Sequence, residues 1–502
     1  MRMSPLYSLL LALSAVSAQK DPNVAENTSA IVHLFEWKFD DVAAECERFL
    51  SPQGYAGVQL SPVNEVIKPN VNDRSWWERY QPISYNIISR SGNEDAFKSM
   101  VHRCNNVNVR IYVDVVLNHM TSNWGDALGT GNSRAFTDDS VYPAVPYGPA
   151  DFHQPTCIIA SSDYGNNATA VRDCELSGLH DLNQTSPYVR EQIISFLNKL
   201  VDAGVAGFRV DAAKHMWPED LQYIYSQIKD LSTLHGFAPQ TRPFIYQEVI
   251  DYGSEAVKSG EYSDLGRVTE FNYGTYLGKG FSGDYPISHF HNFGSDWGML
   301  DDGDALVFVD NHDNQRGSGG GGANILTYKQ SKLYKMAVSF MLSWPYGYPR
   351  VMSSYYFDTH DQGPPQDSDQ NILSPTISAD GTCGNGWVCE HRWRQIYNMV
   401  AFRNVVKGTP VTNWWDNGSQ QIAYSRGNLG FVAFNDQYNT DLKQTIQTSL
   451  PAGTYCDIIS GEKQGSSCTG KSVTVDTDGK AYVEILYSEE DGVLAITVAS
   501  KL

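Results

Sequence analysis

Short apolar runs alternate with longer segments of helical periodicity along most of the chain. The run at 55–62 ends in a Ser-Pro pair, and the nearly continuous apolar run at 110–117 leads into Asn118 and His119. Apolar runs with such boundaries are typical of buried strands. Strands are predicted at 31–37, 55–62, 110–117, 207–210, 243–249, 269–271, 305–309 and 350–353, and helices at 39–50, 93–105, 187–202, 218–231 and 328–342.

The regular alternation of strand and helix predicts a parallel sheet with helices on its faces. Eight strands favour a closed (β/α)8 barrel, the TIM-barrel α/β fold, formed by 19–117 and 183–408. The segment 118–182 has little periodicity and many Gly, Asn, Asp, Ser and Pro residues. It is too long for a simple loop and is predicted to be an irregular domain inserted after the third strand. From 409 to 502, short strands separated by turns predict an antiparallel β-sandwich domain.

The N-terminal and cysteine patterns indicate export. Residues 1–18 have the form of a secretory signal peptide, in which Arg2 precedes an apolar run and small residues precede Gln19. No later stretch reaches about 18 consecutive apolar residues, so the mature protein is predicted to be soluble and extracellular. Eight cysteines fit an oxidising compartment, and their spacing suggests four local disulfides. The predicted pairs are Cys46 with Cys104, Cys157 with Cys174, Cys383 with Cys389, and Cys456 with Cys468.

Composition narrows the function only coarsely. A formal net charge of −20 and the absence of a basic cluster argue against nucleic acid as a partner. The aromatic content of 12% fits stacking on sugar faces, although packing in the core accounts for part of it. Composition therefore indicates a secreted globular protein that could act on a neutral polymer.

Polar and charged side chains lie at the ends of four predicted strands, although apolar protein interiors usually exclude such side chains. In 207–215 (GFRVDAAKH), Arg209 and Asp211 are two residues apart and therefore share one face of a strand. Alone, this pair is more simply interpreted as an internal ion pair. Four such strand ends meet at one rim of a barrel, however, and bring Asp211, Glu248 and Asp313 into one cleft. Carboxylates in a cleft suit glycoside hydrolysis, where burial and mutual repulsion keep one of them protonated.

These stretches resemble a known family. VDVVLNH (113–119), GFRVDAAKH (207–215), YQEVID (246–251) and FVDNHD (308–313) are similar to the four conserved stretches of α-amylases in glycoside hydrolase family thirteen. HLFEW, SWWERYQP, NQRG and RVMSSY resemble its animal branch, and the resemblance spans the mature chain. It implies that Asp211 is the nucleophile, Glu248 the general acid and base, and Asp313 a stabiliser of the transition state. It also implies retention of the α-anomer, with the Asp211 and Glu248 carboxyls about 5 Å apart.

The same resemblance implies a calcium ion bound by the side chains of Asn118 and Asp181 and by the backbone carbonyls of Arg172 and His215. Oxygen ligands of these kinds suit calcium. From the residues alone, loop Asn and Asp more often form local turns.

The resemblance also implies a chloride ion held by Arg209, Asn311 and Arg350. Two guanidinium groups and an amide around one point would hold an anion close to Glu248. In the alternative interpretation, Arg209 and Arg350 merely pair with buried acids.

Substrate contacts are implied in the same way. The resemblance predicts stacking on glucose by aromatic residues and hydrogen bonds to hydroxyls by polar ones, although a pair of adjacent tryptophans is more often part of a core. The glycines at 317–322 suggest a mobile flap, which carries Ser318 where mammalian members have histidine. The predicted contact residues are Trp76, Trp77, Tyr80, Gln81, His119, Tyr164, Lys214 and His312.

Together these observations predict a secreted, monomeric, calcium-dependent and chloride-activated α-amylase that cuts internal α-1,4 bonds of starch and glycogen. One alternative is a non-catalytic, glycan-binding or transporter-associated relative, but such relatives generally lose carboxylates or gain a membrane span. Another is an exo-acting α-glucosidase, against which the animal-type motifs argue. The sizes of the products from soluble starch separate the three.

Overall fold

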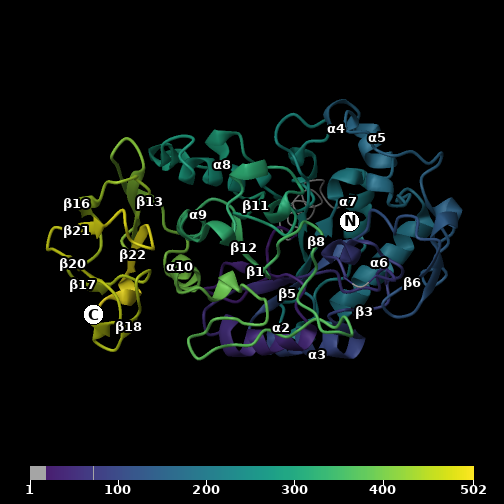
Figure 1. Cartoon of the computed structure of the whole chain (residues 1–502), viewed down its shortest axis with the longest axis horizontal. Helices are drawn as coiled ribbons and strands as arrows, with labels where there is room; N and C mark the ends of the chain where they lie inside the picture. Colours follow the sequence, from purple (N-terminus) through teal and green to yellow (C-terminus); the bar gives the residue numbers. More distant parts are fainter. Residues whose placement is uncertain (1–18, 72) are drawn as a thin grey trace, which may run out of the picture.

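The computed structural model describes residues 19–71 and 73–502, so the predicted signal peptide lies outside the described residues (Figure 1). Eight parallel strands close into a barrel, in the order β1-β12-β11-β10-β9-β8-β5-β2. Each of them overlaps one of the eight predicted strands, and the predicted (β/α)8 fold is confirmed. The strands are β1 (Ile31–Leu34), β2 (Gly57–Leu60), β5 (Arg110–Val116), β8 (Gly207–Asp211), β9 (Phe244–Gln247), β10 (Arg267–Thr269), β11 (Ala305–Val307) and β12 (Tyr348–Ser353).

Helices surround the barrel (Figure 1). In α6, Pro187 occupies the first turn, where its missing N–H costs nothing, and residues such as Ile193 and Leu200 are buried along one face. The helices of this layer are α2 (Phe39–Glu45), α3 (Glu94–Asn106), α6 (Pro187–Asp202), α7 (Pro218–Ser226), α8 (Phe271–Phe281), α9 (Ser331–Ser343) and α10 (Arg394–Val405).

The helix predicted at 187–202 has the bounds of α6, whereas several other predicted helices and strands differ from the structure in their bounds. The helix predicted at 39–50 changes at Cys46 into a π-helical turn, η1 (Cys46–Leu50), and the helix predicted at 218–231 ends at Ser226. The strand predicted at 269–271 is wrong beyond Thr269, because Glu270 caps α8 by accepting a hydrogen bond from the amide of Asn272. The helix α8 was not predicted from the sequence, because its glycines suggest a loop. One of them, Gly278, is required by packing, since an added Cβ would lie 1.6 Å from the carbonyl oxygen of Asn324.

The register of the barrel brings the charged strand ends together. Asp114 on β5 lies opposite Arg209 on β8, and Val116 lies opposite Asp211. The strand β8 can approach β9 closely because it begins with Gly207, where a Cβ would lie 2.2 Å from the carbonyl oxygen of Phe244. The glycine of the GFRVD motif is therefore needed for the close packing of β8 against β9.

The segment after β5 is irregular and is tied back to the barrel. The amide of Leu182 donates to the carbonyl of Asn118 at 2.9 Å, and His119 and Asp181 form an isolated antiparallel bridge. Its regular elements are short: β6 (Asp126–Leu128), β7 (Arg134–Phe136), α4 (Asp163–Asn166) and α5 (Ala168–Asp173), preceded by the hairpin β3 (Ile88–Ser89) and β4 (Gly92–Asn93).

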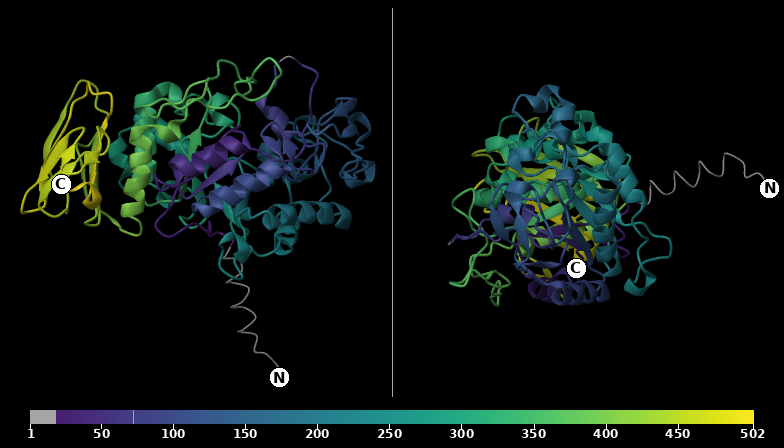
Figure 2. Two further views of the ribbon diagram at one scale, coloured as in Figure 1. Left: turned by 90° about the horizontal axis from the view of Figure 1, so that it is seen from below. Right: turned by 90° about the vertical axis from the view of Figure 1, so that its right-hand side faces the viewer.

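Two four-stranded antiparallel sheets form the C-terminal part, in the orders β13-β14-β15-β22 and β16-β21-β20-β17. Figure 2 shows them at the end of the molecule opposite the irregular segment. The first sheet is buried on both faces: Tyr424 and Phe434 belong to the core shared with the barrel, and Ala423 and Phe431 to the core between the sheets. The strands are β13 (Val411–Asp416), β14 (Gln421–Arg426), β15 (Gly430–Asn435), β16 (Leu442–Gln447), β17 (Gly453–Cys456), β18 (Lys463–Gln464), β19 (Ser467–Cys468), β20 (Ser472–Val475), β21 (Lys480–Ile485) and β22 (Val493–Thr497).

All eight cysteines form disulfides, with the four predicted pairings. Within the described part of the chain, no helix has the length and apolar character needed to span a membrane.

Candidate active site

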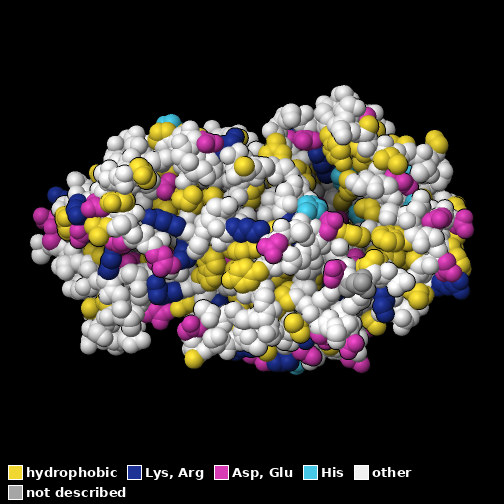
Figure 3. Space-filling view, in the orientation of Figure 1, with side chains coloured by type: hydrophobic (Ala, Val, Ile, Leu, Met, Phe, Trp, Pro, Cys, Tyr) yellow, Lys and Arg dark blue, Asp and Glu magenta, His cyan; other side chains and the backbone are white. Residues whose placement is uncertain are grey.

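A cavity of about 570 Å³ opens at the C-terminal ends of the barrel strands. In the view of Figure 3 the surface is hollowed below the lobe that carries α4 and α5. The residues proposed from the sequence to surround a sugar chain largely meet here. Those that line the cavity are Trp76, Trp77, Tyr80, His119, Tyr164, Asp211, Lys214, His215, Glu248, His312 and Asp313.

A single guanidinium group holds two of the three predicted catalytic acids. Nη1 of Arg209 lies 2.7 Å from Oδ1 of Asp211, and Nη2 lies 2.6 Å from Oε1 of Glu248. Because the two terminal nitrogens of a guanidinium are ~2.3 Å apart, these carboxylate oxygens are within about 8 Å of each other. Nη1 also donates to both oxygens of Asp114, at 2.7 and 2.9 Å. The third acid, Asp313, lines the same cavity.

The turn after β8 brings Glu248 towards Asp211. Ala212 has a left-handed backbone (φ 49°, ψ 31°), a conformation that is costly for a residue with a Cβ. In this conformation its amide donates to Oε2 of Glu248 at 2.9 Å. The backbone strain is thus located between the two acids and orients one of them.

Burial dominates the electrostatics of the acids. It raises the pKa of Asp211 well above its usual value, while Arg209 acts in the opposite direction. It likewise raises the pKa of Asp114, and it raises the pKa of Asp313 to about 7 with a further contribution from the charge of Glu248. Asp114, Asp211 and Asp313 all lie in the field of Arg209, and the cost of burying their charges favours their protonated forms.

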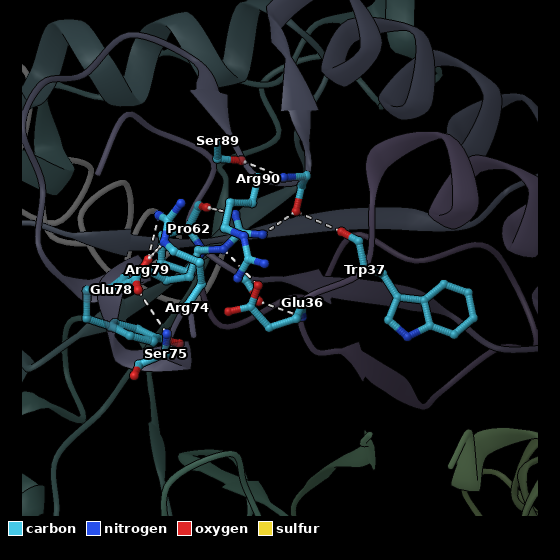
Figure 4. A network of polar contacts seen from close by, with 12 residues as sticks. Glu36, Trp37, Pro62, Arg74, Ser75, Glu78, Arg79, Ser89 and Arg90 are labelled. Carbon is cyan, nitrogen blue, oxygen red and sulfur yellow. Dashed lines mark hydrogen bonds and ion pairs between the residues drawn. The ribbon is translucent and has the colours of Figure 1, made fainter. Parts of the chain in front are cut away.

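The motif SWWERYQP forms a short helix, η2 (Trp76–Tyr80), and its charged residues anchor that helix (Figure 4). Nε of Arg79 donates to Glu36 at 2.9 Å, and Nε of Arg74 donates to Glu78 at 2.6 Å. Glu78 also accepts from the amide of Ser75 at 2.8 Å and so caps the helix. All these side chains except Ser75 are buried. They fix the helix that presents the aromatic residues to the cavity.

The aromatic residues of η2 differ in exposure. Trp76 is nearly buried, and its Nε1 donates to the carbonyl of His360 at 2.9 Å. Tyr80 stacks on His312 with ring centroids 5.2 Å apart, and its hydroxyl donates to Asp114 at 2.9 Å. Trp77 is partly exposed and stacks on Trp124. Trp77 is therefore the member of this set with the most accessible ring.

The polar candidates are partly engaged by the protein itself. Nζ of Lys214 donates to the carbonyl of Ile250 at 2.7 Å, pairs with Glu255 at 2.6 Å and lies 5.1 Å from the ring centroid of Tyr164. Nε2 of His119 donates to the carbonyl of Tyr80 at 2.9 Å. Gln81 does not line the cavity, because its Oε1 accepts three hydrogen bonds from the loop at 122–124.

The glycine-rich loop at 317–322 is connected to both sides of the cavity. Oγ of Ser318 lies 2.7 Å from Nε2 of His360, and the hydroxyl of Tyr252 donates to the carbonyl of Gly319 at 3.0 Å. Every glycine of this loop has a positive φ, between 57° and 95°. Sequence reasoning missed Tyr252, Ile250 and Glu255 as cavity residues; only proximity to Glu248 in the chain could have signalled them.

Unpartnered oxygens gather where the irregular segment meets the barrel. Nδ2 of Asn118 contacts His119 at 3.2 Å, which leaves Oδ1 of Asn118 buried and without a hydrogen bond among the described residues. Oδ1 of Asp181 is in the same state, while its Oδ2 is bonded to His153 at 2.6 Å. His215 reaches this junction by a 2.8 Å contact from Nδ1 to the carbonyl of Val171, next to Arg172. An amide oxygen and a carboxylate oxygen, both buried and without a partner, fit a hard cation such as calcium.

Unpartnered nitrogens gather inside the barrel instead. Nη1 of Arg350 donates to Gln59 at 2.7 Å, whereas Nη2 is buried and has no partner in the described part of the chain. Both ring nitrogens of His33 are likewise buried and unpartnered. Burial lowers the pKa of Arg350, and the nearby positive charge of Arg209 lowers it further. Arg209 pairs with acids, as the alternative interpretation predicts, but Arg350 does not, and its free donor fits an anion. Oδ1 of Asn311 accepts from the amides of Asp313 and Asn314.

Comparison with known proteins agrees with this geometry. Residues 48–351 match the family described as alpha amylase, catalytic domain, and residues 412–499 match alpha amylase, C-terminal all-beta domain. The chain is 57% identical to an alpha-amylase of Tenebrio molitor over 484 residues, which cover 96% of this chain and all of that protein. It is 55% identical to an alpha-amylase-related protein of Drosophila willistoni over 504 residues, the full length of both chains.

A solved structure shares the architecture. Alpha-amylase I of Eisenia fetida superposes with a TM-score of 0.89 at 44% identity, over 95% of this chain and 98% of that one. A glutamate-to-glutamine mutant of that enzyme, in complex with maltohexaose, superposes equally well. With acids, aromatic wall, barrel and C-terminal sheets all in place, the chain belongs to the α-amylase family, the glycoside hydrolases of family thirteen.

Proposed function

We propose that this protein is an endo-acting α-amylase that hydrolyses internal α-1,4 bonds of starch and glycogen with retention of configuration. One observation carries the proposal: Arg209 binds the carboxyls of Asp211 and Glu248 together at the bottom of a cavity walled by aromatic residues. A retaining glycosidase requires two carboxyls on either side of one glycosidic bond.

The proposed reaction gives the two carboxyls different roles. Asp211, bonded to Arg209, attacks C1 of the sugar while Glu248 gives its proton to the leaving glycosidic oxygen. The product is a covalent glycosyl ester of Asp211. Glu248 then takes a proton from water, whose oxygen attacks C1 and releases Asp211, so two inversions restore the α-configuration. Asp313 accepts hydrogen bonds from sugar hydroxyls and stabilises the positive charge that develops on the ring.

Two ions belong to the proposal. Calcium would be held by Asn118, Asp181 and the carbonyls of Arg172 and His215, and it would fix the irregular segment against the barrel beside Asp211. Chloride would be held by Arg209, Asn311 and Arg350, and it would supply a negative charge that favours the protonated form of the neighbouring acids. The unpartnered oxygens of Asn118 and Asp181 support the calcium site, and the unpartnered Nη2 of Arg350 supports the chloride site.

The remaining parts of the proposal concern the whole molecule. Removal of residues 1–18 and export are supported by the signal-like sequence and by the four disulfides. The barrel comprises 19–117 and 183–408, the calcium-binding domain 118–182 and the β-domain 409–502. The protein acts as a monomer on its α-glucan substrate.

A starch digest tests the proposal. The wild-type protein is expected to release maltose and longer oligomers from soluble starch, with newly formed α-anomers detected by proton NMR. Asp211→Asn should reduce kcat by at least about 10⁴-fold, because it removes the nucleophile. Asp358→Asn, which changes an exposed carboxyl, is the matched control and should retain full activity. Release of glucose alone would identify an exo-acting glucosidase, an initial β-product would rule out the double displacement, and the absence of products would identify a non-catalytic relative.

A further inference from the structure

An exposed tryptophan outside the cavity continues its aromatic wall. The rings of Trp77 and Trp124 have centroids 6.2 Å apart and an interplanar angle of 22°. Trp77 lines the cavity, whereas Trp124 belongs to the irregular segment and lies beyond the cavity lining. Trp124 remains 38% exposed, among the largest apolar side chains that the described surface presents. The two indoles therefore form one aromatic surface that runs from inside the cavity to solvent.

Hydrogen bonds hold Trp124 in place at both ends of the residue. Its amide donates to Oγ1 of Thr137 at 2.7 Å, and its Nε1 donates to Oε1 of Gln81 at 2.8 Å. The same Gln81 oxygen accepts from the amide and the hydroxyl of Ser122, both at 3.2 Å. Thr137 is fully buried, so one end of the anchor is part of the core. An indole that is fixed before a ligand arrives loses little conformational entropy on binding.

The chemistry of this surface selects its ligand. An exposed indole next to a cavity offers a flat apolar face that a ligand can cover. The faces of glucose rings carry C–H groups of slight positive charge, which match the negative face of an indole, while the hydroxyls at the ring edges stay in water. Trp77 lines the cavity in which the proposed substrate binds, and the ring of Trp124 lies next to that of Trp77. An α-glucan is therefore the ligand that continuity with the cavity favours.

We infer that Trp124 forms a distal subsite that binds a glucose unit of the α-glucan outside the catalytic cavity and so favours long chains over short ones. The inference rests on the proposed function, since it takes the same substrate one unit further. Trp124 takes no part in bond cleavage. It contributes binding energy that a short oligosaccharide, confined to the cavity, cannot use.

The test compares chain lengths. Trp124→Leu keeps much of the apolar volume but lacks a flat face, whereas Trp124→Phe keeps a flat face but lacks the indole N–H that bonds to Gln81. Initial rates are measured with maltotriose and with maltoheptaose. For maltoheptaose, Trp124→Leu should lower kcat/KM about five- to tenfold, mainly through KM, as expected for the loss of one stacked ring. For maltotriose, kcat/KM should stay within twofold of wild type, and Trp124→Phe should stay within about threefold of wild type on both substrates.

Controls separate this role from a structural one. Tyr438→Leu removes an aromatic ring that is 84% exposed on the C-terminal β-domain and should change neither rate. Equal losses of kcat/KM on both substrates, together with a lower Tm, would overturn the inference and indicate a packing role. A Trp124→Leu variant that hydrolyses maltoheptaose at the wild-type rate would also overturn it. If the wild-type protein hydrolyses neither substrate, the proposed function fails. Calorimetric titration with maltoheptaose then decides the subsite by itself: an affinity at least fivefold lower for Trp124→Leu supports it, and unchanged affinity or absent binding overturns it.

Discussion

Two buried regions near the proposed catalytic acids differ in the unpartnered polar atoms that they contain. At the junction with the irregular segment these atoms include the oxygens of Asn118 and Asp181. Inside the barrel they include the nitrogens of Arg350 and His33. Buried polar groups are nearly always hydrogen-bonded, because an unpartnered one costs about 1–3 kcal/mol. The unpartnered oxygens thus favour a cation in the first region, and the unpartnered nitrogens favour an anion in the second.

The comparison also shows that a raised pKa does not by itself identify the role of a carboxyl group. Burial raises the pKa of Asp181 to about 7 and that of Asp313 to about 7. Asp181 is bonded to His153 and lies near the carboxylates of Asp173 and Glu175, whereas Asp313 lies in the field of Arg209. The two pKa values are alike without ions. Bound calcium would lower the pKa of Asp181, whereas bound chloride would raise that of Asp313.

Removal of calcium is expected to have the largest effect. Dialysis against a chelator should inactivate the enzyme and, for an ion present at a thousand times its Kd, lower the free energy of unfolding by about 4 kcal/mol. Thermal unfolding followed by circular dichroism, with and without added calcium, measures this change. Asp181→Asn should have a low Tm that calcium no longer raises.

The control for the cation region is a carboxylate of the same segment. Asp139 is exposed, so Asp139→Asn should respond to calcium as wild type does. If chelated wild-type protein keeps its activity and Tm, the unpartnered oxygens of Asn118 and Asp181 need another explanation.

Changes to the anion region should affect rate more than stability. Arg350→Gln removes a buried cation whose Nη2 lacks a partner, so the cost of burying it disappears along with the binding site. We expect kcat to fall about 10- to 100-fold, which corresponds to about 1.4–2.7 kcal/mol of transition-state stabilisation, with a Tm close to that of wild type. Steady-state rates on starch, in chloride-free buffer and with added NaCl, give the measurement.

Wild type and variant should differ in their response to the salt. Chloride should activate the wild-type protein and leave Arg350→Gln unchanged, and sodium acetate at the same ionic strength is the control for screening. Equal rates of wild type with and without chloride would favour the alternative in which the two arginines are purely structural.

Some contacts in these regions could be predicted from the sequence and others could not, for physical reasons. The two-residue spacing of Arg209 and Asp211 correctly placed them on one face of a buried strand, since strand geometry is local. That Arg209 also binds Asp114 depends on the register between β5 and β8, which apolar strands do not reveal. The helix α8 was missed because Gly278 is required by a neighbour rather than by its own backbone.

The irregular segment was hardest to predict. Trp124 lies among Gly, Asn and Asp residues without periodicity, so no pattern relates it to Trp77. The resemblance assigned Gln81 to the substrate, yet its side-chain oxygen is occupied by the loop that carries Trp124. Contacts between two aperiodic segments depend on the packing of the whole domain, and a single sequence carries little signal for them.

The smallest expected effect, an exchange of protons, tests the comparison most directly. Calcium favours the ionised form of Asp181, so its pKa of about 7 should fall on binding. Binding at pH 6, where the unbound carboxyl is mostly protonated, should release close to one proton, and binding at pH 9 should release none.

Chloride disfavours ionisation of Asp313, so its pKa of about 7 should rise. Chloride binding should therefore take up a fraction of a proton between pH 7 and 8 and none at pH 5. Calorimetric titrations in buffers of different ionisation enthalpy count these protons, and proton exchange of the same sign for both ions would contradict the assignment of opposite charges to the two regions.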